Sequence, residues 1–359
     1  MNYFILYPAC FFLNFTSFTI IMVFLNFLEY PLLSVYIAII HSIGLFAIKS
    51  FSGEARTLAN HKNLKISSDT FFKLRFLLTI PCVLLFSFCA IYISNLNFTI
   101  FIPFLIRLIL EWFEEIFLIE IEKDKNLSKL KSIFLFQLLS ILFCLIIILT
   151  FKNFFLPLLF WSFSSLFFFK SFYINFLKRI IINLRNQNLK KFFKLNNFNL
   201  ISTNILSTFL LGFLIFIFRE TILNFTGINN SSNFFTAFAI GGILASYFSN
   251  SLGHKSTIFF NKNITTSDFI LIFILLIKLF SGILLVYLTY FYPNIFKFSD
   301  DPLFFRCLGF SLAGSTIMII AQIKKFKILK NKKSDFLGIN LLVNMILVIL
   351  IPLFYYLFD

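Results

Sequence analysis

Long apolar runs recur along almost the whole chain of 359 residues, and short segments rich in charged residues, Asn or Pro separate them. A helix that crosses the hydrocarbon core of a bilayer needs about 20 apolar residues. The pattern therefore predicts an all-α polytopic membrane protein with about eleven transmembrane helices. We expect them near residues 7–27, 31–49, 75–95, 98–119, 132–151, 153–172, 199–218, 234–252, 269–291, 303–322 and 337–357.

Basic residues are distributed unevenly between the two sets of alternate loops. Of the 31 Lys and Arg residues, 25 lie in or beside the loops after the second, fourth, sixth, eighth and tenth expected helices. The opposite loops contain only Lys152, Arg219 and Lys297. Since cytoplasmic loops are enriched in Lys and Arg, the N-terminus is expected in the cytoplasm. An odd number of spans then places Asp359 outside a plasma (inner) membrane.

The connection over residues 171–198 differs from the others in its length and its mixture of basic and apolar residues. Its pattern predicts an amphipathic helix on the anionic cytoplasmic leaflet, although a solvated linker that follows the charge rule explains it as well. In either case it divides the chain into two bundles of six and five helices. We expect an N-terminal lobe over 1–170, the linker over 171–198 and a C-terminal lobe over 199–359.

Composition narrows the class of protein further. Hydrophobic residues make up 59% of the chain and charged residues 13%, so no separate soluble domain is expected. The net charge of +16 would suggest nucleic acid in a soluble protein, but here the cytoplasmic loops explain it, and no nucleic-acid partner is expected. The five cysteines all lie in apolar runs and are predicted to pack as small buried hydrophobic residues.

The fourth expected helix carries an unusual number of charged residues for a membrane span. Arg107, Glu111 and Glu114 are separated by four and three residues, so they share one face of a helix with Leu118 and Glu122. Charge inside a bilayer costs about 2.5 to 3.5 kcal/mol per residue on insertion scales, so this face should contact protein or water and not lipid. It is a candidate lining for a substrate pathway. Alternatively, Arg107 and Glu111 form an internal ion pair.

Two further cations lie within expected spans. Lys278 is well inside the ninth expected helix, and Arg306 is near the outer end of the tenth. Both are candidates for the same pathway, where they would attract a phosphate group. For Arg306 the alternative is a side chain that extends outward or pairs with Asp300 or Asp301. The eighth and tenth expected helices are rich in Gly, Ala and Ser, which predicts close helix packing there.

The sequence lacks the metal-binding and nucleotide-binding motifs that are common in enzymes. The three histidines do not stand with acidic residues at metal-binding spacing, and no P-loop or dinucleotide-binding motif occurs. The expected outer loops are short. We therefore expect no cofactor, no metal site and no enzymatic activity.

The arrangement of six helices, a basic cytoplasmic connection and a second bundle resembles the polysaccharide flippase branch of the superfamily that contains the multidrug and toxin extrusion transporters and the lipid II flippases. Phe51 to Arg56 resembles the family's Gly-containing cytoplasmic turn after the second helix. The stretch from Phe218 through Phe235 to Gly253 resembles its seventh and eighth helices. The family usually has twelve or more helices, and the eleven expected here depart from that number.

The resemblance implies export of a lipid-linked oligosaccharide by alternating access, with the bilayer and other proteins of surface-polysaccharide assembly as partners. Arg107, Lys278 and Arg306 would suit the diphosphate of such a lipid, and Glu111 and Glu114 would be proton carriers. The alternatives are a membrane enzyme of polysaccharide assembly (a polymerase, ligase or acyltransferase) and a small-molecule exporter of the same superfamily.

Overall fold

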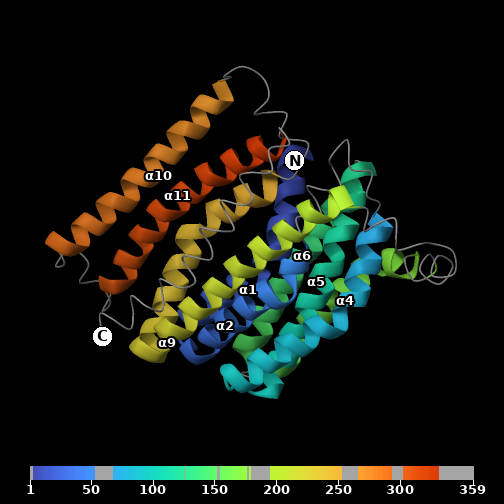
Figure 1. Cartoon of the computed structure of the whole chain (residues 1–359). Helices are drawn as coiled ribbons and strands as arrows, with labels where there is room; N and C mark the ends of the chain where they lie inside the picture. Colours follow the sequence, from blue (N-terminus) through green and yellow to red (C-terminus); the bar gives the residue numbers. More distant parts are fainter. Residues whose placement is uncertain are drawn as a thin grey trace. The chain divides into compact units, whose positions relative to one another are not determined.

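The computed structural model describes residues 3–52, 68–124, 126–151, 154–175, 178, 195–252, 266–292 and 302–330. Within these ranges the chain is helical and contains no strand (Figure 1). The helices are α1 (Tyr3–Phe27), α2 (Pro31–Ala47), the 3₁₀ turn η1 (Lys49–Ser52), α4 (Ser68–Phe88), the π-helical turn η2 (Cys89–Ile93), α5 (Phe98–Asp124), α6 (Leu127–Phe151), α7 (Phe155–Phe168), α9 (Leu195–Leu252), α10 (Thr266–Phe291) and α11 (Pro302–Lys330).

Six segments of the described helices are long and apolar enough to cross a membrane: Pro31–Phe51, Leu74–Ile93, Leu127–Phe151, Ile205–Ile243, Ile272–Phe291 and Leu303–Ile320. Their outward faces carry large apolar side chains, such as Ile80 on α4, Ile146 on α6 and Phe280 on α10. Such faces suit contact with lipid tails. The helical membrane class predicted from the sequence is therefore the class that the structure supports.

Helix bounds differ from the predicted ones in two informative places. First, α4 begins at Ser68, seven residues before the expected start, so Arg75 lies well inside the helix and not at its first residue. Second, the break expected between 218 and 234 is confined to Gly227, where two helical parts of α9 meet, and the residues on both sides of it are helical. Its φ of 73° is a conformation that glycine adopts without strain. The last expected helix, 337–357, lies outside the described residues.

The described chain divides into two compact units. Unit 1 comprises the described residues of Met1–Ser17 and Ile39–Ile222, and unit 2 those of Phe18–Ala38 and Leu223–Lys333. The linker predicted at 171–198 lies mostly outside the described residues, so the boundary between six-helix and five-helix lobes stays a prediction. Each unit is described below by itself.

In unit 1, α5 packs against α4 and α7, and α7 also packs against α6 (Figure 1). Aromatic rings fill the space around one half of α5: the Phe72 ring lies 4.9 Å from that of Phe113, and the Phe169 ring lies 5.7 Å from that of Phe117. The other half approaches α2 closely, because a Cβ at Gly44 would come within 2.6 Å of Leu108. This packing surrounds the charged face of α5 with protein.

In unit 2, α10 and α11 lie side by side and approach each other through two glycines (Figure 1). A Cβ at Gly282 would come within 2.7 Å of the carbonyl oxygen of Gly309, and one at Gly309 within 2.8 Å of that of Gly282. The second part of α9 approaches α11 in the same way, because a Cβ at Gly241 would lie 2.5 Å from the Ser311 side chain. The close packing expected of the small residues in these helices is confirmed.

Candidate functional site

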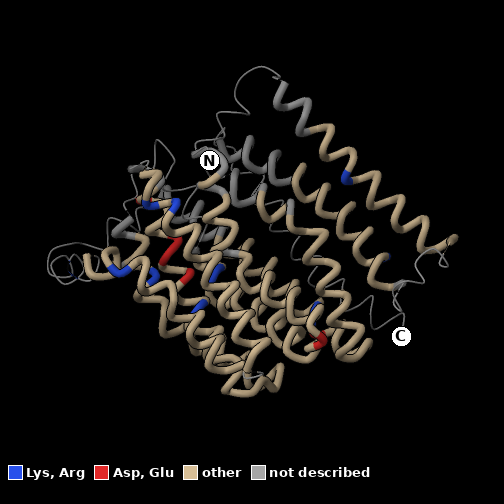
Figure 2. Tube along the Cα trace, turned by 180° about the vertical axis from the view of Figure 1, so that it is seen from behind, with Lys and Arg blue, Asp and Glu red and all other residues tan. Residues whose placement is uncertain are grey.

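The charged face of α5 is buried inside unit 1. Arg107 is 2% exposed, Glu111 and Glu114 are 0% exposed, and Glu115 is 6% exposed. Figure 2 shows the acidic segment of this helix among basic positions of neighbouring segments. The face therefore contacts protein, as its spacing predicts, and not the outward surface that would meet lipid. The side chain of Glu122 lies outside the described residues.

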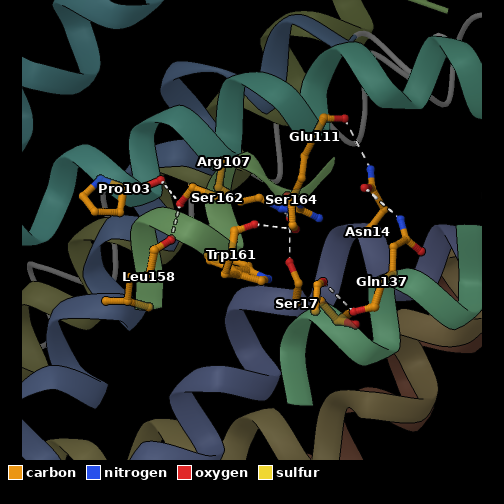
Figure 3. A network of polar contacts seen from close by, with 12 residues as sticks. Asn14, Ser17, Pro103, Arg107, Glu111, Gln137, Leu158, Trp161, Ser162 and Ser164 are labelled. Atoms are coloured by element: carbon orange, nitrogen blue, oxygen red, sulfur yellow. Dashed lines mark hydrogen bonds and ion pairs between the residues drawn. The ribbon is translucent and has the colours of Figure 1, made fainter. Parts of the chain in front are cut away.

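Glu111 is the centre of a network of polar contacts (Figure 3). Its carboxylate accepts a hydrogen bond from Ser17 Oγ at 2.6 Å and pairs with Arg107 Nε at 3.0 Å and Lys49 Nζ at 2.9 Å. Its backbone carbonyl accepts a further hydrogen bond from Asn14 Nδ2 at 3.3 Å. Three side-chain donors therefore converge on one buried carboxylate.

Three separate segments deliver these donors to α5. Arg107 comes from the preceding turn of α5 itself, where residues four apart lie on one face. Ser17 comes from α1, and Lys49 opens the η1 turn directly after α2. Asn14, also on α1, accepts a hydrogen bond from Gln137 Nε2 of α6 at 3.4 Å. The network thus joins four elements of unit 1 through polar contacts.

The Arg107 guanidinium also lies over an aromatic ring of α7. Its Cζ is 5.1 Å from the centre of the Trp161 ring, within the range of a cation–π interaction. On the same helix, Ser162 Oγ donates to the carbonyl oxygen of Pro103 at 2.6 Å, which fixes α7 beside α5 (Figure 3). The guanidinium is therefore positioned by a carboxylate on one side and an indole ring on the other.

A second ion pair lies on the neighbouring face of α5. The Arg75 guanidinium pairs with the Glu115 carboxylate and donates to the backbone carbonyl of Trp112. Its Cζ is 5.5 Å from the centre of the Trp112 ring. This pair is neutral and completely enclosed, which suits a role in fixing α4 to α5.

Glu114 has different surroundings from the other acidic residues of α5. Neither of its carboxylate oxygens accepts a hydrogen bond of ordinary geometry, although the residue is fully buried and the Ser165 hydroxyl is near enough to interact with it. The hydroxyl groups of Ser165 and Tyr173 are likewise buried without a hydrogen-bond partner. Arg107 and Lys49 are near enough to attract Glu114 electrostatically, and Glu111 is near enough to repel it.

Unit 2 contains a buried cation of its own. Lys278 is 5% exposed, and its Nζ donates to Ser315 Oγ at 2.5 Å. Ser315 Oγ in turn donates to the carbonyl oxygen of Gly241 at 2.8 Å. Within the part of the chain that the structure describes, Lys278 has no carboxylate partner. An ammonium group with neutral oxygen partners retains its attraction for an anion.

Arg306 lies near the start of α11, beside the end of α10, and not among the other cations. Its guanidinium donates to the carbonyl oxygen of Thr289 at 3.3 Å and lies over the Tyr290 ring at 4.3 Å. The predicted partners Asp300 and Asp301 lie outside the described residues. These contacts explain Arg306 as a residue that packs α11 against α10.

The sequence-predicted site is therefore only partly assembled. Arg107, Glu111 and Glu114 lie together in unit 1, while Lys278 and Arg306 belong to unit 2 at separate places. Lys49 and Arg75 were missed, because both were counted among cytoplasmic loop charges. The sequence offered one signal of their burial: each lies within one helical turn of a long apolar run. Ser17 and Asn14, polar residues inside the apolar run of the first helix, gave a similar signal.

Among the described residues no group of His, Cys, Asp or Glu side chains could bind a metal ion. Four of the cysteines are buried and Cys307 is partly buried, and all are free thiols. Comparisons of the chain with protein-family models, with curated proteins and with solved structures find no match. The function must therefore be argued from the helices and the buried charges.

Proposed function

We propose that the protein is a membrane transporter that flips or exports a lipid-linked oligosaccharide by alternating access. The observation that carries this proposal is the convergence of two cations, Lys49 and Arg107, on the single carboxylate of Glu111 inside a bundle of apolar helices. Ionisable groups at membrane depth are costly, and they usually mark a substrate or ion pathway.

The chemistry of the two cations favours an anionic substrate group. A guanidinium and an ammonium together match a diphosphate, which offers several acceptor oxygens. Lys278, with only Ser315 as a partner in the described part of unit 2, offers a second attraction for the same kind of group. A lipid-linked sugar carries its negative charge at the link between lipid and sugar. Its lipid tail remains in the bilayer while the charged group crosses.

A transporter and a membrane enzyme differ in what they do to the substrate: the transporter moves the lipid and the enzyme changes it chemically. Vesicles that contain the purified protein and a fluorescent polyprenyl diphosphate sugar should lose inner-leaflet fluorescence to a membrane-impermeant quencher faster than protein-free vesicles do. The recovered lipid should be chemically unchanged. A changed lipid would favour a polymerase, ligase or acyltransferase, and equal rates with and without protein would contradict the transport proposal.

A further inference from the structure

Two glutamates one turn apart on α5 differ sharply in their partners. Glu111 accepts from three side-chain donors, whereas neither oxygen of Glu114 has a hydrogen-bond partner. Both residues are 0% exposed. Three side-chain donors hold the Glu111 carboxylate in place. Glu114 has no such constraint.

The groups that face Glu114 come from each element packed against it. From α5 come Arg107 and Glu111, from η1 comes Lys49, from α7 comes Ser165, and from the helical residues after α7 comes Tyr173. The Ser165 and Tyr173 hydroxyl oxygens are buried without a hydrogen-bond partner, as are the Glu114 oxygens. Buried polar atoms are nearly always satisfied in proteins, so unsatisfied atoms gathered in one place indicate a functional site.

We propose that Glu114 binds a proton when Arg107 and Lys49 bind an anionic group. This inference rests on the proposed function and adds to it the coupling of substrate binding to proton uptake. Glu115 takes no part, because its carboxylate is paired with the Arg75 guanidinium. The Glu111 carboxylate already accepts from Ser17, Arg107 and Lys49.

The charges of the cluster explain the direction of the coupling. Lys49 and Arg107 attract the charged form of the Glu114 carboxylate, and Glu111 repels it. An arriving diphosphate adds negative charge and competes for the attraction of the two cations, so the negative charge of Glu114 becomes unfavourable. A proton from water then adds to a Glu114 oxygen. The resulting carboxylic acid can donate a hydrogen bond to the Ser165 hydroxyl oxygen.

Only one O–H bond forms in this step, and no other reactant is needed. Proton binding and anion binding then favour each other. The protonated protein binds the anion more tightly, and the anion-bound protein binds the proton more tightly. A gradient that drives protons across the membrane in the same direction as the substrate would accelerate substrate movement. If one proton is linked, affinity for the anion should fall by roughly tenfold per pH unit over the range in which the free protein has lost the Glu114 proton and the anion-bound protein still holds it.

The test is titration calorimetry of the full-length protein in detergent with geranylgeranyl diphosphate, in pairs of buffers that differ in ionisation enthalpy, between about pH 6 and pH 8. The difference in heat between paired buffers reports protons taken up on binding. The wild-type protein should take up more protons than the Glu114→Gln variant, by up to one proton per diphosphate. The affinity of the variant should change with pH only as far as the diphosphate itself ionises.

If the wild type and Glu114→Gln take up the same number of protons per diphosphate, the inference is overturned and the transport proposal is left in place. Failure of the wild-type protein to bind the diphosphate would instead contradict the proposed function. A second measurement needs no Glu114 variant. Infrared difference spectra of the wild type should show a new carboxylic acid carbonyl band on binding, and Ser165→Ala should shift that band. Binding without such a band would also overturn the inference.

Discussion

Lys49 Nζ lies 2.9 Å from Glu111 Oε2, so a cation counted with the first cytoplasmic loop is in fact an internal partner of α5. The two residues are 62 positions apart in the sequence, and both are buried. Because Arg107 pairs with the other oxygen of the same carboxylate, Glu111 connects two cations. The loss of Glu111 and the loss of either cation should therefore have unequal consequences.

Replacing Glu111 with Gln should destabilise the protein strongly. Two buried cations would face a neutral amide, and removal of one partner of a buried ion pair costs about 3 to 5 kcal/mol. We expect a large loss of folded protein, measured by size-exclusion chromatography after extraction at increasing temperature. Glu29→Gln makes the same chemical change at an exposed position and should have little effect. Equal behaviour of the two variants would contradict the network.

Replacing Arg107 with Gln should affect transport more than folding. Lys49 and Ser17 would still donate to Glu111, so its charge would not be isolated. Transport would lose a cation that binds the substrate, and a hydrogen bond to a charged group contributes about 1.5 to 3 kcal/mol. The result to check is the rate per folded molecule in vesicles. If Arg107 is only a structural partner, folded protein should be lost instead, and Glu111→Gln in the same chain should restore it.

Replacing Gly282 with Ala should weaken the contact between α10 and α11. A methyl group there would come within 2.7 Å of the Gly309 carbonyl oxygen, and such overpacking costs about 1 to 3 kcal/mol. Gly314→Ala is the matched control on α11, because no atom lies within 4 Å of an added Cβ at that position. We expect a lower unfolding temperature in detergent for the first variant alone. Equal unfolding temperatures would show that this close approach is wrong.

The orientation of the chain can be tested with single cysteines in a variant that lacks the native ones. A cysteine at residue 190 should react with an impermeant maleimide only from the cytoplasmic side, and one at residue 228 only from outside. The expectation rests on the excess of Lys and Arg in one set of loops. Ile228 is exposed in the structure, next to the break in α9 at Gly227, so a label can reach it. Labelling of both positions from one side would refute the topology.

The sequence predicts the positions of helices better than it predicts which side chains contact one another. Apolar length alone locates α2, α6, α10 and α11, because each helix must bury its backbone hydrogen bonds within the membrane. The spacing of Arg107, Glu111 and Glu114 on one face follows from helical geometry, so their common burial in unit 1 could be predicted. Lys49 could not be assigned to Glu111, because a contact across 62 positions depends on how α2 packs against α5.

The break in α9 is narrower than the turn predicted between residues 218 and 234. The structure breaks helical geometry at Gly227 alone, and the Asn and Ser residues beside it are helical. Asn and Ser tolerate helices when their side chains find local partners. Ser231 Oγ, for example, donates to the carbonyl oxygen of Gly227 at 2.6 Å. Such partners cannot be assigned from the sequence alone.

The most direct test of the account compares two lipids and two variants in one vesicle assay. The wild-type protein should flip a fluorescent polyprenyl diphosphate sugar faster than a lipid of equal length with a neutral sugar head. Arg107→Gln should reduce the first rate by about tenfold or more, as expected for a lost charge-assisted hydrogen bond. Lys131→Gln, which removes a cation exposed on α6, should leave that rate unchanged. Equal rates for the two lipids, or equal rates for Arg107→Gln and the wild type, would contradict a substrate pathway at Arg107.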